Sequence, residues 1–174
     1  MEAMKAMKVK DIILIGILSA TITAGKLALS FIPNIEIVTL LFITYTIVFG
    51  YKKTLLISII FSTTEIFIYG FNTWLLGYYL IWPLLILLTA LMKKIIKSEY
   101  GYATIGAIFG YGFGFFFAIV ESFFYGIAYG WVYWLRGLLF DLVHGTSNFI
   151  IILILFNPLK NLLFKLKRTY YNNS

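Results

Sequence analysis

Apolar residues are gathered into long runs, and short polar or basic stretches separate these runs. A helix must be about 20 residues long to cross a hydrocarbon core about 30 Å thick. The pattern therefore predicts an all-α integral membrane protein with six transmembrane helices in one bundle, a single domain over residues 1–174. The predicted spans lie at about 12–31, 36–50, 54–69, 74–92, 101–124 and 132–158. The second and third are short, which predicts tilt, re-entrance or local thinning of the bilayer.

The stretches between spans that are not basic contain residues that end helices. Proline lacks a backbone donor and restricts the residue before it, and Gly-Asn clusters are typical of turns. The start of the chain superficially resembles a signal peptide, but its apolar run has no convincing small-residue cleavage site, so we interpret it as a retained first span. The predicted breaks are Pro33-Asn34, Tyr69-Gly70-Phe71-Asn72, and the region of Gly126 and Gly130.

The composition agrees with this class. Hydrophobic residues make up 61% of the chain and charged residues only 12%, whereas about a quarter of the residues in soluble domains are charged. The chain contains no Cys. This excludes disulfides, thiol chemistry and thiolate metal sites.

The net charge of +7 comes from basic residues beside the ends of the spans. Positive charge in these places marks the cytoplasmic side. Both termini are therefore predicted to be cytoplasmic in a multi-pass cell-membrane protein, and the clustering argues against nucleic-acid binding. Twelve of the fourteen basic residues form four clusters: Lys5, Lys8 and Lys10; Lys52 and Lys53; Lys93, Lys94 and Lys97; and Lys160, Lys165, Lys167 and Arg168.

Seven other ionisable residues fall on the predicted outer side of the spans. A charge in the middle of a membrane costs about 3 to over 10 kcal/mol, so such residues normally face a partner or a water-filled cavity. We expect an outward-facing cavity where these seven converge: Lys26, Glu36, Glu65, Glu121, Arg136, Asp141 and His144. In the alternative interpretation they only neutralise one another, for example Lys26 with Glu36 and Arg136 with Glu121 or Glu65.

Aromatic and small residues add two further patterns. Trp74, Tyr78 and Trp82 recur every four residues and could line the cavity, although interfacial aromatics also form belts at the membrane surface. Strips of small residues let helices approach closely. The strip formed by Gly106, Gly110 and Gly114 predicts packing within the bundle. The strip formed by Gly16, Ala20 and Ala24, on the first span, predicts docking of another membrane subunit.

Catalytic signals are weak. Asp141 and His144, three residues apart, could form an acid/base pair or supply two metal ligands. No HExxH pair, nucleophile motif or Gly-rich phosphate loop accompanies them. We therefore predict no enzyme activity, no cofactor and no metal, and active transport would need an energised partner.

Several short stretches, in this order, are the most specific feature of the chain: Ile32–Thr39 (IPNIEIVT), Phe49–Lys53 (FGYKK), Ile68–Gly70 (IYG), Trp74, Tyr79–Pro83 (YLIWP), Phe140–Gly145 (FDLVHG) and Asn148-Phe149. Together with six short spans and a small-residue strip on the first, they resemble a group of substrate-binding S components of energy-coupling factor (ECF) transporters in Gram-positive bacteria. The resemblance covers nearly the whole chain.

This resemblance implies a subunit that binds a vitamin or vitamin precursor from outside. It would dock, through Ala20 and Ala24 extended by Gly16, on a membrane T component carried by two cytoplasmic ATPases. A loop at about Leu29 to Glu36 would cover the ligand. The ligand signatures of the riboflavin, thiamine and biotin members are missing, so the cargo stays open. The predicted substrate-binding residues are Asn34, Glu36, Glu65, Trp74, Tyr78, Trp82, Glu121, Arg136, Asp141, His144 and Asn148.

Two other classes of function remain open. A small six-span scaffold protein of the cell-wall elongation type would share the size and topology, but would have no reason for an outward group of ionisable residues among aromatics. An intramembrane enzyme would use Asp141 and His144, and its turnover would be lost in H144Q.

Overall fold

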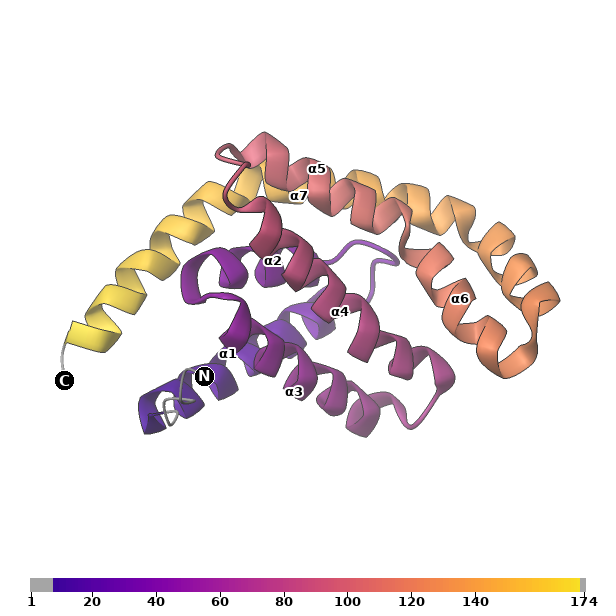
Figure 1. Cartoon of the computed structure of the whole chain (residues 1–174), viewed down its shortest axis with the longest axis horizontal. Coiled ribbons are helices and arrows are strands. Elements are labelled where there is room, and N and C mark those ends of the chain that lie inside the picture. Colours follow the sequence, from indigo (N-terminus) through magenta and orange to yellow (C-terminus); the bar gives the residue numbers. More distant parts are fainter. Residues whose placement is uncertain (1–7, 173–174) are drawn as a thin grey trace, which may run out of the picture.

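The fold is taken from a computed structural model, which describes residues 8–172. Over that range all regular secondary structure is helical. Lys5, a member of the first basic cluster, lies outside the described residues. The elements, drawn in Figure 1, are α1 (Val9–Ala28), α2 (Val38–Phe49), α3 (Tyr51–Tyr69), α4 (Thr73–Met92), α5 (Glu99–Tyr111), α6 (Phe113–Tyr125) and α7 (Ile127–Asn172). The predicted all-α class is confirmed.

Four helical segments are long and apolar enough to cross a membrane: α1, α4, the α5–α6 pair taken together as Glu99–Tyr125, and α7. The 12-residue α2 is apolar but shorter, and α3 has 19 residues and carries Lys52, Lys53 and Glu65. The apolar helices thus indicate a membrane protein. Each predicted span coincides with helix, with some differences in its boundaries.

The clearest differences concern the last two spans. The predicted span 101–124 bends at Gly112, where α5 ends and α6 begins (Figure 1), and glycine is a common cause of such bends. The predicted span 132–158 is part of a 46-residue helix that continues through Pro158. Beyond Pro158 the helix still packs on the bundle, since Leu163 is buried and the Lys167 ammonium donates to the Val48 carbonyl oxygen at 2.6 Å.

The predicted breaks are mostly confirmed. Residues 29–37 form an irregular loop between α1 and α2 in which Asn34 has a φ of +59°. Gly70 and Gly126 end α3 and α6 with φ values of +78° and +89°, a conformation that favours glycine. The prediction that Gly130 also breaks the chain is wrong. Gly130 lies inside α7 and faces α6, where a side chain would collide with Ala118 and Ser122.

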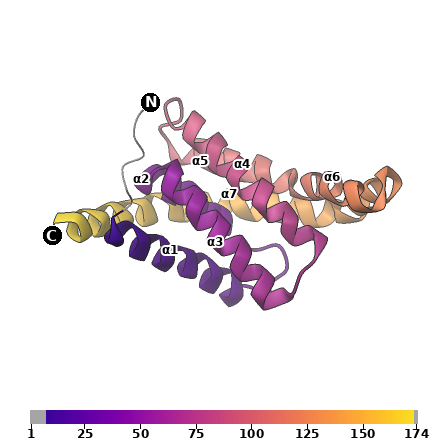
Figure 2. The ribbon, with the colours of Figure 1, turned by 60° about the horizontal axis from the view of Figure 1, so that its bottom comes forward.

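α7 runs beside α6 and then α5 (Figure 1), and the glycine ladder makes this approach close. A Cβ atom on Gly110 of α5 would lie 2.7 Å from the Gly145 Cα atom of α7, which is too close for a nonbonded contact, so this approach requires glycine at position 110. The ladder is therefore used for packing within the bundle, as the sequence predicts. Figure 2 shows α1 and α3 packed side by side, away from the contact between α5 and α7.

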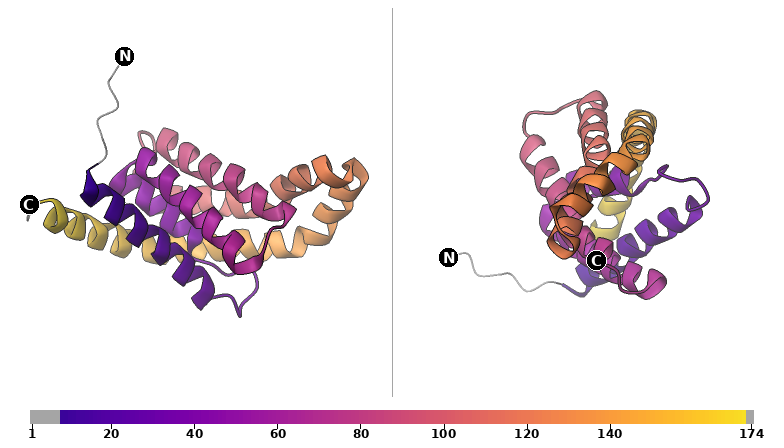
Figure 3. Two further views of the ribbon diagram at one scale, coloured as in Figure 1. Left: turned by 90° about the horizontal axis from the view of Figure 1, so that it is seen from below. Right: turned by 90° about the vertical axis from the view of Figure 1, so that its right-hand side faces the viewer.

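The helix ends that carry the described members of the basic clusters lie at one end of the bundle, where α1 begins and α7 ends (Figure 3). There the Tyr170 hydroxyl donates to the Lys10 carbonyl oxygen at 2.9 Å, and the Lys53 ammonium lies 2.7 Å from Asp11 Oδ1. Lys93, Lys97, Lys160 and Lys167 line one common hollow. The turns after α1, α3 and α6 lie away from this end (Figure 3).

Candidate functional site

A cavity of about 460 Å³ lies between α4, α6 and α7. Its size is within the range of small-molecule sites, and its wall is mainly aromatic. We call it the large compartment. It is lined by Asn34, Trp74, Tyr78, Phe113, Gly114, Phe117, Tyr129, Val132, Tyr133, Arg136, Gly137, Phe140 and Asp141.

A second hollow of about 260 Å³ lies beneath the α1–α2 loop. We call it the small compartment. Asn34, Tyr78 and Phe113 line both hollows, so the two compartments are neighbours with a shared wall. The other lining residues of the small compartment are Lys26, Leu29, Ser30, Ile32, Pro33, Ile35, Glu36, Val38, Tyr69, Trp82 and His144.

Asp141 is the buried charge of the large compartment, with only 7% of its surface exposed. Its Oδ1 atom accepts the Gly114 N–H group at 2.9 Å, while its Oδ2 atom has no hydrogen-bond partner among residues 8–172. Arg136, five residues earlier on α7, is exposed and lines the same compartment. It forms no ion pair with any described carboxylate, so its predicted pairing with Glu121 or Glu65 is not formed.

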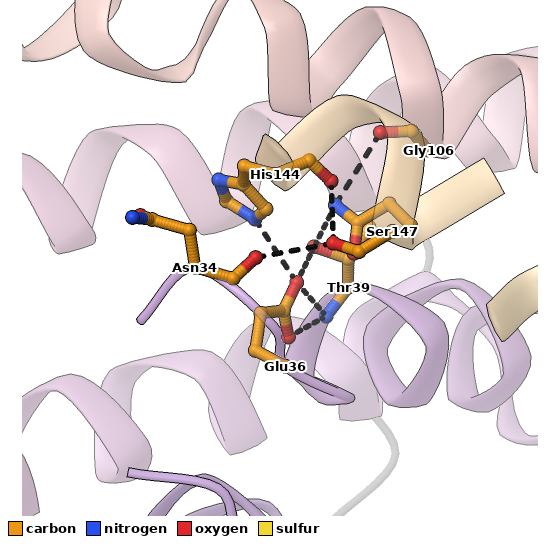
Figure 4. Close-up of polar contacts among 7 residues, drawn as sticks. Asn34, Glu36, Thr39, Gly106, His144 and Ser147 are labelled. Carbon is orange, nitrogen blue, oxygen red and sulfur yellow. Dashed lines mark hydrogen bonds and ion pairs between the residues drawn. The ribbon is translucent and has the colours of Figure 1, made fainter. Parts of the chain in front are cut away.

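The small compartment contains a network around Glu36 (Figure 4). His144 Nε2 lies 3.2 Å from Glu36 Oε1, and the two side chains point toward one another. Glu36 also accepts the Thr39 N–H group at 2.9 Å and the Thr39 hydroxyl at 2.5 Å. Glu36 thereby satisfies one of the free N–H groups at the start of α2.

Three further hydrogen bonds tie α7 to the elements around this network (Figure 4). The Ser147 hydroxyl donates to the Asn34 carbonyl oxygen at 3.1 Å, which fixes the loop to α7. The Asn148 amide donates to the Thr39 hydroxyl oxygen at 3.2 Å and to the Gly106 carbonyl oxygen at 3.4 Å. The loop over the small compartment is thus held at two points, by His144 and by Ser147.

Lys26 sits in a cage of aromatic rings at the edge of the small compartment. Its ammonium lies 4.6 Å from the ring centre of Tyr69, 5.3 Å from that of Tyr78 and 5.8 Å from that of Trp74, within the range of cation–π attraction. It also forms an ion pair with Glu65, which is fully buried. In the alternative interpretation, mutual neutralisation, Glu36 is the example of a partner for Lys26. The structure gives it Glu65 instead, because Glu36 faces His144.

The predicted site residues fall into two groups. Eight line the compartments: Asn34, Glu36, Trp74, Tyr78, Trp82, Arg136, Asp141 and His144. Three are buried behind the walls, each held by another side chain: Glu65 by Lys26, Glu121 by the Thr73 hydroxyl at 2.8 Å, and Asn148 by Thr39.

Several lining residues were missing from the prediction. Lys26 was placed on the outer side but not in the site. Phe113 and Phe117, and likewise Tyr129 and Tyr133, recur every four residues and face the large compartment. That spacing is the signal for them, but the phenylalanines lie in the glycine-rich run whose glycines predict packing within the bundle, and tyrosines near the end of a span are also typical of an aromatic belt.

The possible catalytic pair is not assembled. Asp141 bonds to Gly114 and His144 to Glu36, and in the described part of the chain no hydrogen bond joins Asp141 to His144. Over the same residues, no group of three His, Cys, Asp or Glu side chains is placed to hold a metal ion. The arrangement presents isolated hydrogen-bonding groups on an aromatic wall, which is suited to binding.

The predicted docking strip lies on the outside of the bundle. Gly16, Ala20 and Ala24 are exposed, and the space beside Gly16 holds no atom within 4 Å of where a Cβ would stand. The buried face of α1 is formed instead by Ile15, Leu18, Ser19 and Ile22. The strip is therefore not used for packing within the chain.

Comparisons with known proteins give no relative of this chain: no family model, curated protein or solved structure matches it.

Proposed function

We propose that this protein is the substrate-binding membrane subunit of an ECF-type uptake transporter, an S component that captures a vitamin or vitamin precursor from outside the cell. The observation that carries the proposal is the large compartment, an aromatic-walled cavity with a buried carboxylate that has one unpartnered oxygen. Such a wall suits a flat ring, and the few polar groups would orient it.

The proposal includes six crossings with both termini in the cytoplasm. In its support, the described members of the basic clusters lie at one end of the bundle and the compartments lie away from it. Lysines beside the ends of spans mark the cytoplasmic side, so the cavity would open to the exterior. The short α2 would cross with a locally thinned bilayer.

The energised partner would be a membrane T component with two cytoplasmic ATPases. The exposed strip of Gly16, Ala20 and Ala24 supports such a contact, because small residues on the outside of a helix let another helix approach. The chain itself has no Gly-rich phosphate loop, so the energy for uptake would come from the partner.

A thermal-shift panel on the detergent-purified chain tests the proposal. The panel contains cobalamin and its precursors, pyrimidine and thiazole precursors, pantothenate, folate, pyridoxine and queuosine-type bases. A ligand that binds only the folded state adds about 4 kcal/mol at a thousandfold excess over Kd. We expect one compound class to give a large shift, and a folded protein that responds to none would contradict the proposal.

Two variants connect any shift to the cavity. Tyr129 lines the large compartment and is 47% exposed, so Y129A removes part of the wall without opening the core. Leu139, on the same helix, is 76% exposed and lines neither compartment. We expect the ligand-induced shift to fall in Y129A and to be unchanged in L139A. Equal shifts in both variants would place the ligand elsewhere.

A further inference from the structure

The charges around the two compartments do not balance. Four carboxylates lie in or directly behind the walls, on Glu36, Glu65, Glu121 and Asp141, whereas the permanent cations there are Lys26 and Arg136. Buried charges are costly unless they are paired and hydrogen-bonded. A surplus of carboxylates therefore favours a ligand that brings positive charge or strong N–H donors.

Asp141 is the carboxylate placed to receive that donor. Glu65 has Lys26, Glu36 has His144 and Thr39, and Glu121 has the Thr73 hydroxyl. Asp141 has only the Gly114 N–H group, on Oδ1. The residue is only 7% exposed in the wall of the large compartment, and Oδ2 has no partner among the described residues. An unsatisfied buried carboxylate oxygen costs stability, and a ligand N–H group would relieve that cost.

The aromatic wall beside Asp141 already accommodates a cation. Tyr78 and Trp74, which line the large compartment, also form two sides of the cage around the Lys26 ammonium. The faces of aromatic rings attract cations by their quadrupole, and more strongly when water is excluded. Trp74 and Tyr78 are therefore shared between the Lys26 cage and the wall of the large compartment.

We infer that the ligand of the large compartment is a flat aromatic or heteroaromatic molecule with a protonated N–H group, such as an amidine or an aminopyrimidinium, which donates to Asp141 Oδ2. This inference rests on the proposed function and specifies its ligand class. Arg136 is exposed at the same compartment and is free to meet an acceptor at the far end of the ligand.

Three small probes of nearly equal shape isolate the charge. Benzamidine is a cation with N–H donors, benzamide is neutral and benzoate is an anion. Isothermal titration of the purified chain with each should give benzamidine the tightest binding, about ten- to a hundredfold tighter than benzamide, as expected for a hydrogen bond to a charged group. Benzoate should bind most weakly.

The D141N variant ties that preference to one atom. Asparagine can keep the bond from the Gly114 N–H group through its Oδ1 atom, while an NH₂ donor replaces the free acceptor Oδ2. The preference for benzamidine over benzamide should disappear in D141N and persist in L139A. If D141N does not fold, the order of the three probes on the unaltered chain still decides the question.

The outcomes separate the inference from the function it rests on. Equal or tighter binding of benzamide or benzoate overturns the inference, as does a thermal-shift hit that is neutral or anionic, and in both cases a binding subunit remains. If none of the three probes binds but the panel yields a cationic heteroaromatic that D141N no longer binds, the inference is supported. If no compound of any charge binds the folded protein, the proposed function itself fails.

Discussion

Charged side chains occupy both ends of the bundle, but the two ends differ in how deeply they bury them. At the basic end, the side chains of the Lys53–Asp11 pair are 27% and 17% exposed. At the cavity end, Lys26 pairs with Glu65, and the Glu65 side chain is not exposed at all. Charge at the basic end fits a role in setting orientation across a membrane, whereas charge at the cavity end is buried among rings and must be satisfied by particular partners.

The network around Glu36 is a second example of charge at the cavity end that is held by particular partners. Glu36 accepts hydrogen bonds from Thr39 and faces His144, and these contacts join the α1–α2 loop to α2 and α7. Many of the lysines at the basic end are exposed and extend from helix ends. Removing a charge should therefore have very different effects at the two ends.

The largest loss of stability is expected in K26M. This variant leaves Glu65 buried without its cation, and removing one partner of a buried pair typically costs about 3–5 kcal/mol. Thermal unfolding of the purified protein measures the loss. The double variant K26M/E65Q should recover most of it, because glutamine carries no charge. A loss below about 1 kcal/mol in K26M would mean that Glu65 does not depend on Lys26.

An intermediate effect is expected where the cavity wall is tight. In G114A, the new Cβ atom would lie 2.5 Å from Asp141 Oδ2, so the carboxylate must move, and overpacking of this kind costs about 1–3 kcal/mol. Gly137 lines the same compartment but has no atom within 4 Å of a Cβ. G137A should be as stable as the parent or up to about 1 kcal/mol more stable. Unfolding temperatures in the opposite order would contradict this geometry.

The sequence predicted the fold better than the site, and the reasons are physical. The apolar runs and the turn residues Pro33, Gly70 and Gly126 act locally, so they fixed the helices and most of their ends. The bend at Gly112 and the helical position of Gly130 depend on packing between α5, α6 and α7, and glycine alone does not distinguish a break from a close contact.

Within the site, the sequence placed the ionisable residues on one side but could not pair them. Lys26 lies on α1, and its partner depends on the rotation of α3 about its axis and on the path of the α1–α2 loop. The rotation of α3 turns Glu65 toward Lys26, whereas Glu36 lies in the α1–α2 loop, and the path of that loop brings it to His144. Periodicity identifies which residues share a face of one helix, whereas partners on different helices follow from packing.

The smallest effect is expected in K53M, the counterpart of K26M at the basic end. The Lys53 ammonium lies 2.7 Å from Asp11 Oδ1 and 2.8 Å from the Tyr171 hydroxyl, yet both members of the ion pair are partly exposed. Pairs in such places contribute about 0–1 kcal/mol and weaken as salt screens them. K53M should therefore lose no more than about 1 kcal/mol of stability, and less at high salt. The control K52M should lose no stability, because Lys52 is exposed and belongs to none of the ion pairs among the described residues. If K53M destabilised the protein as much as K26M does, burial would not explain the difference between the two ends. Glu65 would then depend on its cation no more than the partly exposed Asp11 does.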